Sequence, residues 1–296
     1  MSDNNYIRQK ISKDKFYFRG FKENYMENKV PIRFFVFTFL WSWLFWGIAV
    51  FLSQGNTQDV VFPSFGIEFA LMFLGANGPI IGAIISILTI EGKGAIKKFF
   101  KSFLSVKFGW KVWLSIFLVL SLTSIISWII PEFFGEESVS TYLPSIYIFP
   151  IYILMMIFLG GGQEEIGWRG YIMPYLEKKY GLIIGGLILG IIWAVWHLPL
   201  WFVVGSTQKY MSFLGFMIMC IGYSYFFSWV IKESGNRLFS GLVAHGVANA
   251  FAALFPYILM VENVKQLRMW IYFILTFTIG IIIVITRIYK IIKRGT

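Results

Sequence analysis

Eight long apolar stretches, separated by clusters of charge, constrain this chain more than any other feature. They cover roughly residues 34–53, 67–90, 111–130, 146–163, 183–204, 212–231, 239–258 and 269–287. About 20 apolar residues in a helix cross a hydrocarbon core of about 30 Å. A soluble protein does not hide so many such stretches in one core. The sequence therefore predicts an all-α, polytopic membrane protein, a bundle of eight transmembrane helices in the lipid bilayer.

The basic residues predict the orientation of this bundle. With the N-terminus in the cytoplasm, the inner segments hold 23 of the 26 Lys and Arg residues, and the outer loops hold only Lys209, Lys265 and Arg268. Such an excess of basic residues is typical of cytoplasmic loops. We therefore expect both termini to be cytoplasmic. The same distribution explains the net charge of +11 without a nucleic acid partner.

The chain divides into a basic cytoplasmic tail, residues 1–33, and a membrane domain, residues 34–290. The tail lacks the short apolar region and cleavage site of a signal peptide. Segment 93–109 has lysines around an apolar face, which predicts an amphipathic helix in the membrane interface. Within the spans, Gly78-Pro79 predicts a kink, and glycines at four-residue spacing from Gly181 to Gly190 predict close helix packing.

Three polar clusters lie at membrane depth, where ionisable groups are costly and usually functional. The first ends the fourth span and contains Glu164, Glu165 and Arg169. Glu165 and Arg169 are four residues apart, so on a helix they can form an ion pair. Glu164 points about 100° away and is free to act as a general base. A solvated Glu/Arg patch at the membrane border explains this cluster alone about as well.

The second and third clusters contain the two histidines of the chain. Trp193 precedes His197 by four residues in the fifth span, and can wall a pocket or stack on the imidazole. His245 precedes Asn249 by four residues in the seventh span, so their donors can converge on one oxygen, as an oxyanion hole requires. A lone histidine in an apolar helix is usually a packing residue, but here both histidines lie in predicted spans.

In this order, the three clusters resemble the family of CAAX prenyl endopeptidases and bacteriocin-processing enzymes, also called the Abi or CPBP family. Its pattern is E-E-x-x-x-R, then F/W-x-x-x-H, then H-x-x-x-N or a near variant. Here the pattern stands as Glu164-Glu165 with Arg169, Trp193 with His197, and His245 with Asn249. The resemblance covers about residues 145–255, which we expect to be the catalytic core.

The resemblance implies an intramembrane endopeptidase and a role for each of six residues. Glu164 would activate the attacking water with help from His197, and Glu165 and Arg169 would hold that carboxylate in place. His245 and Asn249 would stabilise the oxyanion. The family is usually called a metalloprotease family. Glu164, His197 and His245 can supply three zinc ligands, but no H-E-x-x-H helix is present. A metal-free mechanism fits equally well.

The expected substrate is a membrane-associated peptide or protein. Bacterial relatives act in peptide maturation and bacteriocin immunity, and the Ile- and Lys-rich composition is compatible with a bacterial plasma membrane. The alternatives are a membrane transporter and a non-catalytic scaffold or immunity protein of the same fold. No inverted repeat favours a transporter, and a scaffold would be expected to have lost motif residues.

The depth of His197 raises a geometric problem. It lies about 21 Å along a helix that starts at residue 183, past the middle of the membrane. The fifth span must therefore start later and run past residue 204, or be strongly tilted, or border a deep water-filled cavity. We expect Glu164, His197, His245 and Asn249 to surround one cavity that opens to the cytoplasm.

Overall fold

The computed structural model describes residues 31–54, 66–261 and 264–293, and within these ranges every secondary-structure element is a helix. The all-α prediction is confirmed. The predicted basic tail lies almost wholly outside the described residues, which begin at residue 31. Five helical stretches are long and apolar enough to cross a membrane, or six when a bent pair counts as one span. One of the five, Ile146–Phe202, contains two of the eight predicted spans.

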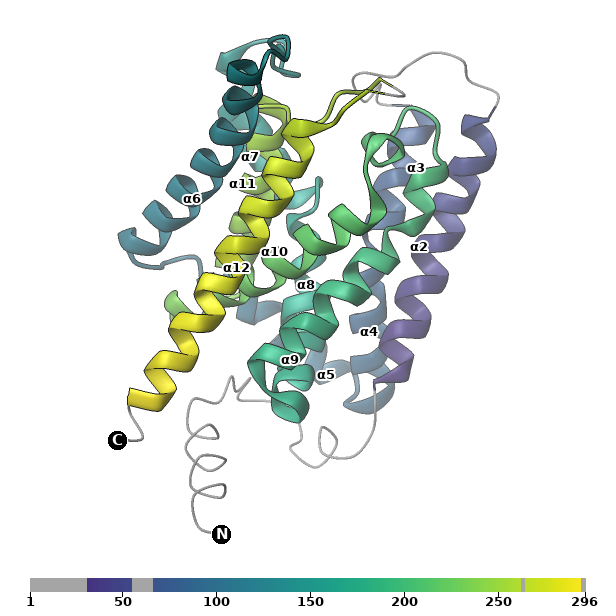
Figure 1. Ribbon diagram of the computed structural model, residues 1–296. Coiled ribbons are helices and arrows are strands. Elements are labelled where there is room, and N and C mark those ends of the chain that lie inside the picture. The colour runs from purple at the N-terminus through teal and green to yellow at the C-terminus, as the bar shows by residue number, and fades with distance from the viewer. Residues whose placement is uncertain (1–30, 55–65, 262–263, 294–296) are drawn as a thin grey trace.

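The first helices pack through small residues. Helix α2 (Ile32–Ser53) lies beside α3 (Ile67–Ala76) and α4 (Gly78–Ile90) (Figure 1). A side chain at Gly75 or Gly78 would collide with Trp46 or Ser42 of α2, so these glycines let the helices approach. Helices α3 and α4 are bent by 43° at Asn77, just before Pro79. The kink predicted at Gly78-Pro79 is therefore confirmed.

The predicted amphipathic segment forms α5 (Lys93–Lys101) followed by the short turn η2 (Ser102–Leu104). Its aromatic side chains Phe99 and Phe103 are buried, whereas its lysines are exposed. The helix is thus amphipathic as predicted but shorter than residues 93–109. Helix α6 (Trp110–Ile129) then runs to the turn η3 (Ile130–Phe134).

The centre of the bundle is formed by α10 (Phe213–Glu233) and α11 (Phe239–Leu254), whose side chains are mostly buried. Around them pack α7 (Phe149–Phe158), α9 (Met173–Trp196), α12 (Leu267–Lys293) and α6 (Figure 1). Side chains at Gly186 and Gly190 of α9 would collide with Tyr225 and Ile221 of α10. The predicted close packing is confirmed at these two glycines.

Several helix boundaries differ from the prediction. Residues 164–182, expected to be an inner loop, are largely helical, and α9 begins at Met173 and bends at Gly181, where φ is 79°. Gly181 is therefore a kink and not a packing site. Helix α9 ends at Trp196, because Pro199 follows and disfavours helix before it. The suggestion that the fifth span runs past residue 204 is wrong. Helix α11 likewise ends at Leu254, just before Pro256.

Candidate active site

The two glutamates follow a short interruption in the helical structure, a break in the helix between α7 and the next helical turns. Gly161 has a φ of 124°, which favours glycine. The Gln163 side chain bridges the break: its Oε1 accepts a hydrogen bond from Gly161 N at 2.9 Å, and its Nε2 donates to Leu159 O at 3.3 Å. The chain then continues as η5 (Gly162–Glu164), α8 (Glu165–Gly167) and a π-helical turn, η6 (Trp168–Ile172).

Glu165 is fully buried and joins two cationic or potentially cationic partners. Its Oε1 accepts hydrogen bonds from Arg169 Nη1 at 2.8 Å and from His245 Nδ1 at 2.9 Å. The predicted ion pair between Glu165 and Arg169 is confirmed. The first and third clusters of the sequence are therefore linked through one carboxylate oxygen.

Arg169 is held mainly by aromatic rings. Its guanidinium carbon lies 4.7 Å from the ring centre of Trp193 and 5.3 Å from that of Phe227, distances suited to cation–π attraction. Its Nε and Nη2 are buried and have no hydrogen-bond partner among the residues that the structure describes. Phe227 was not predicted as a site residue. An aromatic side chain in an apolar span carries no sequence signal that separates it from ordinary packing.

Trp193 occupies the centre of the cluster. Its indole Nε1 donates a hydrogen bond to Glu164 Oε2 at 2.9 Å, and its ring lies 5.8 Å from the ring of His197 and 5.2 Å from that of His245. Glu164 is buried and has Trp193 as its partner, whereas Glu165 pairs with Arg169. The two neighbouring glutamates thus have different partners. The pairing of Glu165 with Arg169 was predicted, whereas the bond from Trp193 to Glu164, which was expected to be free, was not.

His197 lies directly after the last residue of α9. Its Nδ1 is 2.8 Å from the carbonyl oxygen of Trp193. Because a carbonyl oxygen can only accept, this Nδ1 carries the hydrogen, and Nε2 has a free lone pair. Trp46 stacks on the imidazole at 5.9 Å, and Phe216 packs edge-on at 5.2 Å. Neither Trp46 nor Phe216 was predicted to lie beside this histidine.

The side chains of His245 and Asn249 both lie beside the break in the helix at Gly160 and Gly161. Asn249 Nδ2 donates to Gly160 O at 2.6 Å. A Cβ atom placed on Gly161 would lie 2.5 Å from Asn249 Nδ2 and 2.8 Å from His245 Nε2. The two nitrogens therefore lie close to the backbone of Gly161, where any larger residue would collide with them. That both donors converge on one substrate oxygen stays a prediction.

The zinc alternative was tested against this arrangement. Among the residues that the structure describes, no three His, Cys, Asp or Glu side chains are placed so that they could hold a metal ion. Glu164, His197 and His245 do not fit a zinc site as arranged here. Whether the protein uses one stays a prediction.

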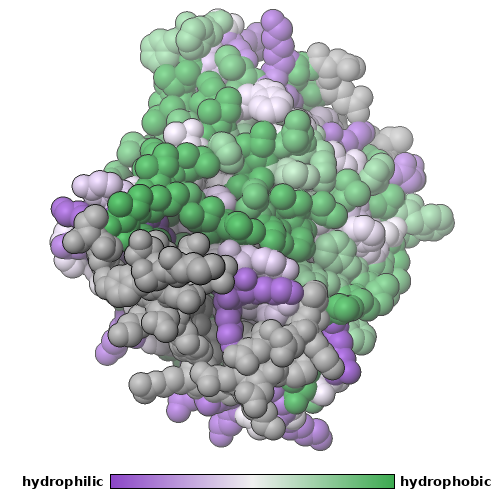
Figure 2. Space-filling model, turned by 60° about the horizontal axis from the view of Figure 1, so that its bottom comes forward, coloured by the Kyte–Doolittle hydropathy of each residue, from purple (hydrophilic) through white to green (hydrophobic). Residues whose placement is uncertain are grey.

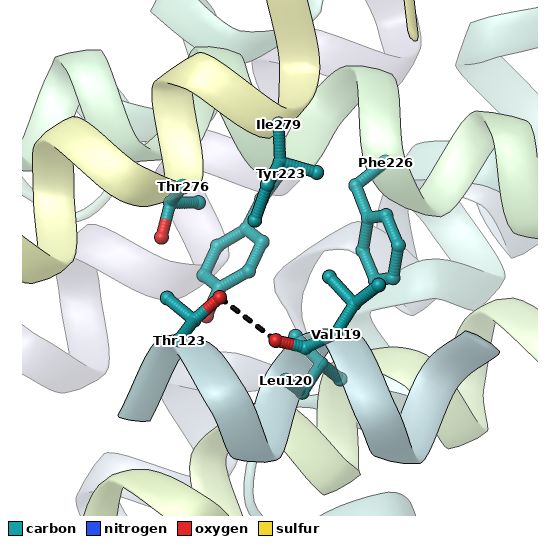
Figure 3. Close-up of a pocket in the computed structure, with 7 residues that line it drawn as sticks. All are labelled: Val119, Leu120, Thr123, Tyr223, Phe226, Thr276 and Ile279. Atoms are coloured by element: carbon teal, nitrogen blue, oxygen red, sulfur yellow. Dashed lines mark hydrogen bonds between the residues drawn. The ribbon is translucent and has the colours of Figure 1, made fainter. Parts of the chain in front are cut away.

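A small pocket lies away from these residues, between α6, α10 and α12 (Figure 3). Its lining is largely apolar and includes Leu120, Phe226 and Ile279. Its threonines bond backbone atoms of their own helices, as in the 2.8 Å bond from Thr123 Oγ1 to Val119 O. The pocket contains none of the predicted site residues.

Two comparisons with known proteins cover this part of the chain. The model of the family described as type II CAAX prenyl endopeptidase Rce1-like matches residues 146–251, a range that contains all six candidate residues. A CAAX prenyl protease 2 of Methanococcus maripaludis is 24% identical over an aligned length of 230 residues, and the alignment covers 74% of this chain and 82% of that protein.

The chain is thus related to the CAAX prenyl endopeptidases, and the resemblance seen in its three motifs is confirmed. The coarse function supported by these comparisons is that of a membrane protease. The relative is archaeal, so the comparisons do not support the expectation of a bacterial plasma membrane.

Proposed function

We propose that this chain is an intramembrane endopeptidase that hydrolyses a peptide bond in a membrane-associated peptide or protein. One observation carries the proposal: the three polar clusters, far apart in sequence, meet around the Trp193 indole. Glu164 bonds its Nε1, while the rings of His197 and His245 pack against it. Packing alone does not require a base, a second acceptor and two convergent donors in one place.

In the proposed reaction, Glu164 takes a proton from water, and the resulting hydroxide attacks the carbonyl carbon of the substrate. The lone pair on His197 Nε2 accepts a hydrogen bond from the hydrogen that the water keeps, and so orients the attacking oxygen. The peptide C–N bond then breaks, and Glu164 returns its proton to the leaving amine. General acid–base catalysis of this kind contributes about 10²–10⁴-fold to the rate.

The negative oxygen that forms on the carbonyl is stabilised by two donors. Asn249 uses one N–H on Gly160 O and has a second available. His245 acts as the imidazolium, with Nδ1–H on Glu165 and Nε2–H directed to the oxyanion. Glu165 and Arg169 do not touch the substrate in this scheme. They hold His245 and the chain segment that carries Glu164.

The proposal includes the membrane topology predicted from the sequence. The bundle spans the bilayer eight times with both termini in the cytoplasm, and the short helix α11 is one of the spans. Helices α5 and the C-terminal end of α12 lie at the same end of the molecule, which supports this orientation (Figure 1). The name of the archaeal relative makes prenylated C-terminal tails one candidate substrate.

The deciding experiment compares membranes that contain the wild type, Glu164→Gln or the control Glu233→Gln, which changes an exposed glutamate at the end of α10. Protein and peptide termini are mapped by mass spectrometry. We expect at least one membrane-associated product to be lost, and its precursor to accumulate, only with Glu164→Gln. Identical sets of termini in all three membranes would contradict proteolysis.

The metal question is settled on the purified enzyme with the product found in that experiment. Activity is measured after treatment with a chelator and again after zinc is added, and bound metal is measured directly. Full activity without bound metal is expected from the metal-free scheme. Loss on chelation with recovery on zinc would support the zinc alternative in place of that scheme.

A further inference from the structure

The amphipathic helix α5 lies directly against the turn that carries Arg169. A Cβ atom on Gly170, in the π-helical turn η6, would lie 2.5 Å from Phe103 and 3.4 Å from Phe99. Both aromatic side chains are buried. The absence of a side chain at Gly170 therefore lets the apolar face of α5 and η2 pack on η6, one residue from the guanidinium that pairs with Glu165.

The same element also contacts the approach to α11. The guanidinium of Arg237, in the loop before α11, donates a hydrogen bond to the hydroxyl of Ser105, which follows η2. Helix α11 carries His245 and Asn249. Segment 93–105 thus touches both halves of the site, the turn that carries Arg169 and the loop before the helix of the oxyanion donors.

The opposite face of α5 is basic and open to its surroundings. Lys93, Lys97 and Lys101 are exposed and lie within about 80° of one another around the helix. None of them forms an ion pair with a described residue. Exposed apolar side chains follow at once, with Leu104 at 74% and Trp110 at 68% exposure. Lysines beside exposed apolar side chains are typical of a segment at the membrane surface.

The end of the molecule that carries α5 has hydrophilic side chains beneath a wide hydrophobic band (Figure 2). Such a boundary is expected where headgroups meet the hydrocarbon core. A basic segment near an anionic bilayer surface gains about fivefold in affinity for each lysine. Charge complementarity therefore selects anionic phospholipid headgroups as the occupant of this face.

We propose that anionic phospholipid headgroups bind Lys93, Lys97 and Lys101, and that this contact stabilises the η6 turn through Phe99 and Phe103. The lipid surface then favours the arrangement in which Arg169 holds Glu165. This proposal concerns the order of the turn and does not depend on proteolysis, so either proposal can fail without the other.

The test measures hydrogen exchange of the full chain in nanodiscs of phosphatidylcholine, with and without phosphatidylglycerol. With the anionic lipid, we expect amide exchange to slow about fivefold or more in residues 93–104 and also in residues 168–172. The triple variant Lys93→Gln, Lys97→Gln, Lys101→Gln should lose both effects while exchanging like the wild type in phosphatidylcholine alone.

A charge-matched control changes three basic residues at the same end of the molecule, Arg287→Gln, Lys290→Gln and Lys293→Gln on α12. It should keep the response to the anionic lipid. The proposal is overturned if this control loses the response equally, or if residues 93–104 become protected while residues 168–172 do not. Should the lysine variant fail to fold, the wild type still decides: added salt must abolish both effects.

Discussion

Two buried arginines, Arg169 and Arg268, are equally excluded from solvent and are satisfied in opposite ways. Each is 1% exposed. Arg268, near the start of α12, uses every nitrogen of its guanidinium. Its Nε donates to Trp128 O at 3.2 Å, Nη1 to Glu136 Oε2 at 2.5 Å and Nη2 to Glu137 O at 2.7 Å. These bonds tie α12 to the end of α6 and the loop that follows it.

Arg169, by contrast, has one hydrogen-bond partner and two nitrogens without any. Its remaining contacts are the faces of Trp193 and Phe227. Arg169 is therefore placed by one ion pair and two aromatic rings, and Arg268 by a full set of hydrogen bonds. The comparison indicates that Arg268 is a structural clamp between helices, whereas Arg169 serves to position Glu165.

The candidate site around Arg169 and the clamp around Arg268 should respond differently to substitution. The largest effect on catalysis is expected at Asn249, in the candidate site. Asn249→Ala removes one donor to the oxyanion and should lower kcat by about 10²–10³-fold. The measurement is the rate at which the enzyme forms the product identified in the Glu164→Gln experiment. Gln266→Ala is the matched control, because Gln266 is an amide near the clamp that bonds Leu259 in both directions. If both variants slow turnover alike, the assignment of Asn249 is wrong.

A second effect should appear in stability and not in turnover. Arg268→Met leaves Glu136 and two backbone carbonyls without their partner. Breaking a buried ion pair costs about 3–5 kcal/mol, and the partial exposure of Glu136 lowers this to about 2 kcal/mol. Thermal unfolding in detergent measures the loss, with Lys265→Met as the control at an exposed position three residues away.

For Arg268→Met, kcat per folded molecule should stay within about twofold of the wild type, because the clamp touches none of the reacting groups. If Arg268→Met kept the unfolding temperature of the wild type but lost turnover, the assignment of Arg268 as a structural residue would be wrong. Arg268 would then act on catalysis, and its complete set of hydrogen bonds would not mark a purely structural role.

The same pair shows how far sequence alone could go. The link between Glu165 and Arg169 followed from a spacing of four residues, and it forms although Arg169 lies in a π-helical turn. From the sequence, Arg268 was expected to be an ordinary basic residue of an outer loop. Its partners at Trp128 and Glu136 lie more than 130 residues away. No local pattern connects residues at that separation.

The ends of the helices were misjudged for a related reason. Average hydrophobicity indicated where the spans lie, but single residues determine where the helices end. Gly161 interrupts the helix before Glu164, and Pro199 follows the end of α9. The side-chain nitrogens His245 Nε2 and Asn249 Nδ2 both lie close to Gly161. No pattern in the sequence revealed which side chains would lie beside this glycine.

The smallest effect tests the residue at the centre of the site. Trp193→Phe keeps an aromatic ring between the histidines but removes the N–H that bonds Glu164 Oε2 at 2.9 Å. A hydrogen bond to a charged group contributes about 1.5–3 kcal/mol, so kcat/KM should fall by about tenfold or more. The physical reason is that Glu164 loses the contact that fixes its position.

Trp196→Phe is the matched control for this change. Trp196 is equally buried, one helical turn from Trp193, and its indole nitrogen has no hydrogen-bond partner. Both variants remove a similar amount of ring, so packing losses should be alike and thermal unfolding should shift by similar amounts. Only Trp193→Phe should lower kcat/KM. Equal losses in the two variants would mean that the ring of Trp193 matters for packing alone, and that its N–H does not position Glu164.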